Sequence, residues 1–226
     1  MAHTKHSIMP LNVTTINEKI METNLPADLK PDAIVKAIAT AVLNPAHLFV
    51  HLKEHTDVLL NLAPKIDNLY NAQANAPEWV MPEATAKVGR YCVAKYKGRW
   101  LRAQIVRTEP NHQCVLLHYV DYGYRRYVPL SELRYMMPEL AAIPCQVVRI
   151  ALAHLNPSEG TWTDACVQHV ANAVRGRVFY MRIVNVHKKD NALDVIFGDW
   201  VSELRGPNGK SFNRQLAVRS DIVYSE

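Results

Sequence analysis

The stretch from Tyr91 to Leu130 reads YCVAKYKGRWLRAQIVRTEPNHQCVLLHYVDYGYRRYVPL and decides the fold. Short runs in and around it are rich in β-branched and aromatic residues, which favour strands, and polar turns separate them. The turns include Lys97-Gly98, which suits a tight hairpin, and Tyr122-Gly123, where glycine can take a positive φ. Short strands at this spacing are typical of a small all-β barrel. The predicted strands are 88–95, 100–107, 114–121 and 124–130.

Upstream of these strands, residues 56–74 carry apolar side chains at intervals of three and four, which predicts a helix with Thr56 or Asp57 as N-cap. Pro64 predicts a kink or a broken turn inside it. The prolines in 76–82 mark a connector between this helix and the barrel.

Residues 32–43 leave two alternatives open. Their alanine content and an apolar face at helical spacing favour a helix, whereas the family resemblance carried by the motifs described below favours a strand. We expect a strand over the second half only. Residues 1–30 contain three prolines and no clean period, so we expect a flexible lead-in.

After the barrel, the pattern predicts a strand at 146–152, an amphipathic helix at 161–174, and a hairpin of strands 177–187 and 193–200 around the turn 188–191. Strands, a helix and further strands in this order are typical of an OB-like barrel. Its first strands would be those that precede the helix 56–74.

The composition bounds the function. The chain has 226 residues, 49% hydrophobic, with a net charge of +5. It lacks an 18-residue apolar run, and the N-terminus lacks a secretory pattern, so we expect a soluble, intracellular protein without membrane contact. Its basic residues are dispersed, and the pairs Arg125-Arg126 and Lys188-Lys189 are typical of solvated turns.

The four cysteines stand far apart and predict buried thiols rather than a zinc site or disulfides. His47, His51 and His55 repeat every four residues, as metal ligands on a helix do. However, the strand predicted at 47–53 would spoil that geometry. We therefore expect neither a metal nor a cofactor.

Three motifs in the barrel stretch resemble a Tudor barrel: Cys92-x-Ala94-x-Tyr96, Trp100-x-Arg102-Ala103 and Tyr119-Val120-Asp121-Tyr122-Gly123. Flanking pieces agree with the extended Tudor domain, in which a split OB-like lobe, similar to staphylococcal nuclease, surrounds that barrel. They are Asn44-Pro45-x-x-Leu48-x-Val50, Ile143-Pro144-Cys145 and Trp162, and the resemblance covers about Ile34 to Asp221.

The resemblance implies a mainly β fold with helices, in which an SH3-like Tudor barrel is inserted in the split OB-like barrel and a long helix joins them. We expect five segments: 1–30 as lead-in, 31–55 as the first strands of the OB-like lobe, 56–82 as linker helix and connector, 83–137 as Tudor barrel and 138–226 as the rest of the lobe. Trp100 and Trp162 are expected in the hydrophobic core.

The resemblance also implies a function. Extended Tudor domains of germline Tudor proteins are scaffold modules that bind the arginine-rich tails of Piwi-class Argonautes in cytoplasmic, perinuclear granules of the piRNA pathway. The implied partners are such a tail, methylated or not, and further modules of a larger scaffold. We expect no enzymatic activity, and the sequence leaves open whether the chain is a fragment of a longer protein.

The family's cage has four aromatic positions and one asparagine. By motif, Tyr96, Tyr119 and Tyr122 take three of the aromatic positions. Leu101 stands where the second aromatic is common, and Tyr124 stands where the asparagine is.

A planar, weakly hydrated guanidinium can lie against aromatic faces and keep its attraction to them. Methyl groups on the guanidinium add apolar surface, which favours binding in a closed cage. The family's asparagine forms a hydrogen bond with the remaining N–H group of the guanidinium. With Leu101 and Tyr124 in place, both contributions to the binding of methylated arginine become smaller, so we expect little preference for dimethylarginine. An unmodified arginine, held partly by the Asp121 carboxylate, becomes a candidate ligand.

Three rival functions remain. An enzyme reading rests on Asp194, Asp199 and Glu203 near Arg205, which form no recognisable calcium-binding set. Single-stranded RNA binding rests on the OB-like lobe and the positive charge. The two altered cage positions also fit a module that has lost its ligand and serves as a spacer or dimerisation unit.

Overall fold

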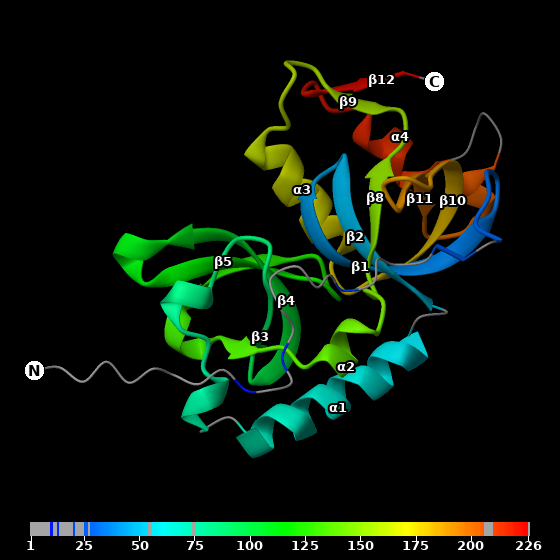
Figure 1. The fold of residues 1–226 in the computed structure, drawn as a ribbon. Coiled ribbons are helices and arrows are strands. Elements are labelled where there is room, and N and C mark those ends of the chain that lie inside the picture. Colours follow the sequence, from blue (N-terminus) through cyan, green and yellow to red (C-terminus); the bar gives the residue numbers. More distant parts are fainter. Residues whose placement is uncertain are drawn as a thin grey trace, which may run out of the picture. The chain divides into compact units, whose positions relative to one another are not determined.

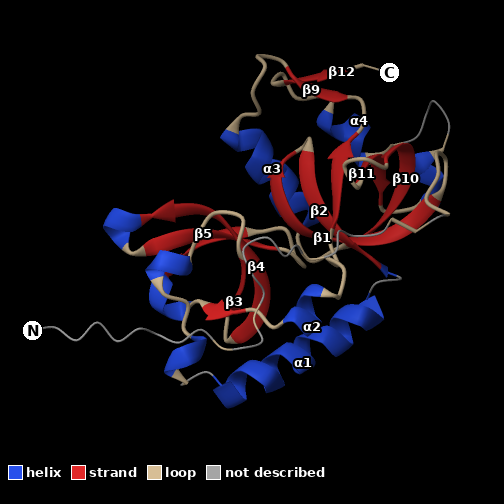
Figure 2. Cartoon of the chain, in the orientation of Figure 1, coloured by secondary structure: helices blue, strands red, loops and turns tan. Residues whose placement is uncertain are grey.

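The computed structural model describes residues 10, 13, 20, 25–26, 28–53, 56–73, 76–205 and 210–225. These residues form two compact units (Figures 1 and 2). The first unit comprises 57–121 and 125–145 with the described residues among 1–22. The second unit comprises the described residues among 23–56, 122–124 and 146–226. Most of the first unit, residues 57–121 and 125–145, is therefore inserted between the two main segments of the second unit.

The first unit contains a five-stranded antiparallel sheet in the order β6-β5-β4-β3-β7. Its edge strands β6 and β7 form no ladder with each other in the part of the chain that the structure describes, so hydrogen bonds do not close the expected small barrel. The strands are β3 Tyr91–Tyr96, β4 Arg99–Glu109, β5 Cys114–Tyr119, β6 Arg125–Pro129 and β7 Arg134–Tyr135.

The hairpin between β3 and β4 follows the sequence prediction. Lys97 and Gly98 have φ angles of 49° and 81°. Two successive positive φ values are what a two-residue primed turn requires, because its twist matches that of the strands.

Helix α1, Thr56–Gln73, supplies the apolar face that covers this unit's core. The helix runs without a break through Pro64, so the expected broken turn is absent. Buried Tyr70 packs 5.7 Å from the Trp100 ring, and its hydroxyl donates to the Tyr135 carbonyl oxygen at 2.8 Å. Trp100 is 3% exposed and lies in this core, as predicted. The remaining short helical elements of this unit are α2 Pro138–Ala141 and the 3-10 turns Pro77–Trp79, Glu83–Thr85, Pro110–His112 and Leu130–Glu132.

A buried ion pair crosses the interior of the first unit. The Arg102 side chain is fully buried, and its Nε and Nη2 atoms donate to the two Asp121 carboxylate oxygens at 2.9 and 2.5 Å. Its remaining N–H groups donate to the carbonyl oxygens of Leu140, Ile143 and Pro144 at 2.6, 2.6 and 2.9 Å. One guanidinium thus ties strand β4 to the end of β5 and to the segment after α2.

The second unit is a closed barrel in the order β1-β10-β11-β8-β2, with β11 and β8 parallel and the other pairs antiparallel. This confirms the mainly β fold with a split OB-like barrel. The strands are β1 Ile34–Asn44, β2 His47–Leu52, β8 Val148–Leu152, β10 Val178–His187 and β11 Ala192–Gly198. A separate two-stranded sheet pairs β9 Leu155–Pro157 with β12 Ile222–Tyr224, which lie beside each other in Figure 1.

Helix α3, Asp164–Val174, packs beside this barrel and buries Cys166, Val170 and Val174. Thr163 is the N-cap of this helix: its hydroxyl oxygen accepts from the Cys166 N–H at 3.1 Å. Trp162 is partly buried against the barrel core, as predicted. The unit's other helical elements are the 3-10 turn Val201–Leu204 and α4 Phe212–Leu216.

The expectation that 32–43 is a strand over its second half only is wrong, because strand β1 begins at Ile34. The first half of β1 pairs with β10, and it also pairs with β2 from Ala37 onward. Ladders on both sides satisfy the backbone N–H and C=O groups, so tertiary pairing overrides the helix propensity of the alanines. The flexibility expected for 1–30 falls mostly outside the described residues.

Asn213 of α4 connects strand β11 to Ala153, the residue that follows β8, through one buried amide. Its Oδ1 accepts from the Phe197 N–H at 3.0 Å, and its Nδ2 donates to the carbonyl oxygens of Ala153 and Val195, both at 3.0 Å. The side chain is fully buried. We expect Asn213→Ala to lower the free energy of unfolding by about 1–3 kcal/mol, because backbone groups lose their partners. Urea denaturation of the two chains measures this, and an unchanged midpoint would contradict it.

Candidate functional site

The first pair of predicted cage residues, Tyr96 and Tyr119, lies in the first unit. Tyr96 ends β3 and Tyr119 ends β5, and their ring centroids are 5.7 Å apart with planes tilted by 45°. Tyr96 is half-buried, whereas Tyr119 is fully buried and its hydroxyl donates to the Lys95 carbonyl oxygen at 3.3 Å. Burial raises the pKa of Tyr119 to about 12, so the phenol stays neutral. The two rings are in direct contact.

The second pair, Tyr122 and Tyr124, belongs to the second unit. Their ring centroids are 5.6 Å apart, tilted by 34°. The His51 ring of β2 meets the Tyr122 ring edge-on at 5.3 Å. Thr40 Oγ1 of β1 lies 2.6 Å from the Tyr122 carbonyl oxygen. Both tyrosine side chains are half-buried.

Gly123 sets the bend between these two tyrosines. Its φ is +85°, and a Cβ atom there would lie 2.1 Å from Cγ of buried Phe49. Glycine is therefore required by backbone conformation and by space together. The Gly123–Phe49 contact fixes the backbone of Tyr122 and Tyr124 against strand β2.

The two remaining predicted site residues are buried. Leu101 is 6% exposed and pairs with Ala94 in the β3–β4 ladder. Asp121 is 3% exposed, and both its carboxylate oxygens accept from Arg102. Because Asp121 holds the chain's own guanidinium, we assign it a positioning role at the turn between the two tyrosine pairs.

Sequence reasoning missed several neighbours of these tyrosines. Thr40 and His51 gave no local signal, since only the β1–β2 hairpin brings them to Tyr122. The Tyr96 ring also carries two of the chain's own cations: Lys97 Nζ lies 5.4 Å and Arg126 Cζ 5.7 Å from its centroid. The doublet Arg125-Arg126 gave a signal but was interpreted as solvated surface.

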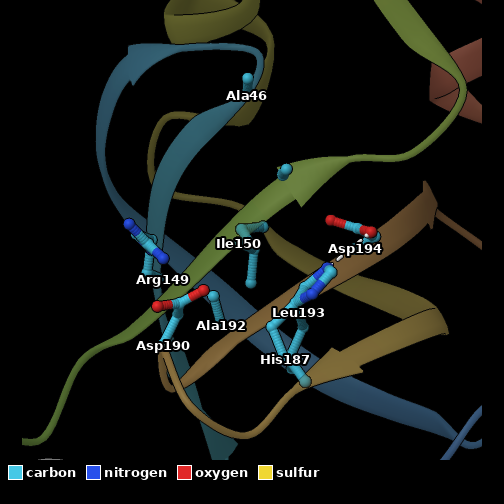
Figure 3. Close-up of a pocket in the computed structure, with 9 residues that line it drawn as sticks. Ala46, Arg149, Ile150, His187, Asp190, Ala192, Leu193 and Asp194 are labelled. Atoms are coloured by element: carbon cyan, nitrogen blue, oxygen red, sulfur yellow. Dashed lines mark hydrogen bonds and ion pairs between the residues drawn. The ribbon is translucent and has the colours of Figure 1, made fainter.

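A polar pocket of about 260 Å³ lies on the barrel of the second unit (Figure 3). His187 Nε2 is 2.8 Å from Asp194 Oδ2, and Asn185 Nδ2 donates to the same oxygen at 3.0 Å. Arg149 and Asp190 also line the pocket.

Asp199 and Glu203, the other two carboxylates considered for an enzyme, are held by local contacts. Asp199 accepts from Arg177 at 2.6 Å through both oxygens, and Glu203 accepts from the Asp199 N–H at 2.8 Å at the start of a 3-10 turn. Among the described residues no three metal-ligating side chains converge. His47 and His51 lie on strand β2, and His55 lies outside the described residues.

The cysteines in the described structure are free thiols. Cys92 and Cys166 are buried, and burial raises the pKa of the Cys92 thiol to about 12. None of the described helices is long and apolar enough to cross a membrane.

A Tudor-type antiparallel sheet inserted in a split, closed OB-like barrel defines the class of extended Tudor domains. The chain belongs to the Tudor domain family, whose model matches residues 29–154.

Solved structures share the fold. The human TDRD1 extended Tudor domain, in complex with a symmetrically dimethylated peptide, superposes with a TM-score of 0.75 at 19% identity, covering 94% of this chain and 99% of that one. The Drosophila melanogaster Papi extended Tudor domain, in complex with an unmethylated Piwi N-terminal peptide, gives 0.69 at 17% identity, covering 85% and 100%.

Among curated proteins, the KH domain-containing protein akap-1 of Caenorhabditis elegans is 30% identical over 164 residues. That match covers 71% of this chain and 18% of akap-1. The chain thus spans less than a fifth of this relative's length.

Proposed function

We propose that this chain is a non-enzymatic peptide-binding module that receives an arginine of an arginine-rich Piwi/Argonaute tail at its two tyrosine pairs. The observation that carries the proposal is the spacing of the pairs along the chain. Only Val120 and Asp121 separate Tyr119 from Tyr122, so covalent geometry alone keeps their Cα atoms within about 11 Å.

Tyrosine faces suit this ligand. A guanidinium is planar, always charged and weakly hydrated, and each aromatic face contributes about 0.5–2 kcal/mol. The half-buried rings of Tyr96, Tyr122 and Tyr124 together supply a few kcal/mol, whereas micromolar binding needs about 8 kcal/mol. Backbone and flanking contacts of the peptide must supply the rest.

The Tyr96–Tyr119 pair must open to admit a ligand. At a centroid distance of 5.7 Å the rings leave no space for a guanidinium between them. Tyr119 is buried and hydrogen-bonded to the Lys95 carbonyl, so it forms the floor. Tyr96, half-buried at the strand end, is the ring that rotates in this proposal.

Methylation should matter little. Leu101 is buried in the β3–β4 ladder and offers no aromatic wall, and Tyr124 offers a phenol in place of an amide carbonyl. Papi, a structural neighbour, has been solved with a Piwi peptide in symmetrically dimethylated and in unmethylated form. We infer that unmethylated and dimethylated tails bind this chain with similar affinity.

Isothermal calorimetry with matched Piwi-tail peptides, unmodified and symmetrically dimethylated, tests the proposal. We expect Tyr96→Ala and Tyr122→Ala each to weaken binding by about two- to thirtyfold, because each removes a ring face worth about 0.5–2 kcal/mol. Tyr127→Ala is the matched control: Tyr127 lies on β6, is 46% exposed and is no part of the cage.

Undiminished binding by Tyr96→Ala and Tyr122→Ala would refute the cage. Tenfold tighter binding of the dimethylated peptide would refute only the indifference to methylation.

We further propose that the chain lacks catalytic activity and acts as one module of a larger scaffold in cytoplasmic, perinuclear germline granules. The support for the first part is local: Asp199 and Glu203 already serve an ion pair and a helix cap. The support for the second is family membership and the small share of akap-1 that the chain covers.

A further inference from the structure

A basic pocket of about 470 Å³ lies on the first unit, beside Tyr96. Side chains from β3, the β3–β4 turn, β6 and β7 line it. The cations among them are Lys95, Lys97, Arg126 and Arg134, and the acid is Glu132. Four cations less one carboxylate leave a formal lining charge of +3.

Aromatic rings hold these cations in place. Lys95 Nζ lies 4.8 Å and Arg134 Cζ 5.6 Å from the centroid of the buried Trp100 ring. Lys97 and Arg126 approach the Tyr96 ring in the same way, at 5.4 and 5.7 Å. A cation–π contact positions a cation without neutralising it, so the positive charge stays available to a ligand.

Carboxylate pairing differs between the cations of this pocket and several arginines elsewhere in the molecule. Arg102, Arg177 and Arg219 each form an ion pair with an aspartate. Within the described ranges, Lys95, Lys97 and Arg126 form no such pair within 4.0 Å.

One member of the pocket is held rigidly. Arg134 Nη1 donates to the carbonyl oxygens of Ser131 and Leu133 at 2.8 and 3.0 Å. Partial burial lowers the pKa of Arg134, yet an arginine remains charged at neutral pH. A pre-oriented guanidinium beside lysine ammonium groups suits a carboxylate or phosphate group.

The pocket bears directly on the proposed arginine ligand. Because Lys97 and Arg126 already contact Tyr96, an incoming guanidinium meets like charges at the ring that is meant to receive it. A peptide made only of arginines and small neutral residues would be repelled there. A peptide that carries an anion beside the arginine would neutralise these cations as it binds.

The rings argue for a peptide rather than single-stranded RNA. Single-stranded nucleic acid gains affinity by stacking bases on exposed aromatic faces. Trp100 is 3% exposed and two cations lie against its ring, and two further cations lie against Tyr96. The pocket therefore offers positive charge without a stacking platform.

We propose that this basic pocket binds an acidic or phosphorylated side chain of the same peptide whose arginine enters the tyrosine cage. This rests on the proposed function and refines its ligand class. Because Tyr96 borders both sites and an extended peptide advances about 3.3 Å per residue, the anion stands about two to four residues from the arginine.

The test is calorimetry with three peptides that share one arginine and differ at a position three residues away: glutamine, glutamate or phosphoserine. The variant is Arg126→Gln, and the control is Arg107→Gln, an exposed arginine of β4 outside the pocket. For the chain without substitutions, at low salt, we expect the glutamate peptide to bind about tenfold tighter than the glutamine peptide. The phosphoserine peptide should bind tighter still. Added salt should shrink both gains.

Arg126→Gln should change the affinities for the acidic and the neutral peptide in different ways. It should reduce the ratio of the affinities for the glutamate and glutamine peptides to about threefold or less, because the pocket has lost one cation. It should also leave unchanged or strengthen binding of the glutamine peptide, because the competing guanidinium at Tyr96 is gone. Arg107→Gln should behave as the unmodified chain in both comparisons.

Equal affinity for the three peptides, or an undiminished gain in Arg126→Gln, would overturn the pocket. Displacement of the peptides by oligouridylate through Arg126, with no gain from glutamate, would also overturn it in favour of RNA. A failure of the tyrosine cage alone would give a different result. Replacing the arginine of the peptide by glutamine would then leave the affinity unchanged. The tighter binding of the glutamate peptide, and its dependence on Arg126, would persist.

Discussion

Arg102→Met is expected to destabilise the chain by about 3–5 kcal/mol, the cost of leaving a buried charge without its partner. The Asp121 carboxylate, 3% exposed, would lose both donors, and three backbone carbonyl oxygens would lose theirs. A domain of this size has a total stability of about 5–15 kcal/mol. The loss is therefore about one fifth of that stability at the least, and all of it at the most.

Urea denaturation followed by circular dichroism measures the change. Arg107→Met is the matched control on the same strand, since Arg107 is 61% exposed and only 3.5 Å from Glu109, and we expect an effect below about 1 kcal/mol. Arg102→Lys keeps the charge but cannot make five directed bonds, so it should remain strongly destabilised. A wild-type midpoint for Arg102→Met would show that the pair is dispensable.

Gly123→Ala is expected to cost about 2–5 kcal/mol and to weaken arginine-peptide binding at least about tenfold. The positive φ of +85° accounts for about 1–2 kcal/mol. The new Cβ atom, 2.1 Å from Phe49 Cγ, forces a buried ring or the turn to move. Either shift displaces Tyr122 or Tyr124, which flank this residue.

Gly160→Ala isolates the backbone part of this effect. Gly160 belongs to the same unit and has a φ of +76°, but nothing lies within 4 Å of a Cβ atom there. We expect it to cost about 1–2 kcal/mol and to leave peptide affinity unchanged. Equal losses in the two variants, in stability and in binding, would mean that the Phe49 contact has no role.

Most strands could be predicted because local pattern and tertiary structure agree. The Lys97-Gly98 turn fixes the β3–β4 hairpin, and the 188–191 turn likewise joins β10 to β11. Strand β1 shows the limit. Its alanines carry a helical signal, and only partners far along the chain, at 178–182, turn the first half into a strand. No local window contains that information.

The candidate site was predictable in its residue types but not in its surroundings. The spacing of Tyr96, Tyr119 and Tyr122 identified the tyrosines, but nothing in it assigned Asp121 to Arg102. An arginine between Leu101 and Ala103 in an apolar strand is a sign of a buried ion pair, and it was the signal that pattern reasoning left unused. Contact of both tyrosine pairs with one arginine ligand stays a prediction.

The pairing of β2 with β8 has a consequence for how the chain folds. Leu48 faces Ile150 in this ladder, so the contact closes a loop of 102 residues (150 − 48) that contains most of the first unit. Closing so long a loop in an unfolded chain carries a large entropy penalty, which shrinks once the intervening residues have collapsed. Folding should accordingly begin within the inserted unit, and the OB-like barrel should be the last part to form, after residues 178–198 have left the ribosome.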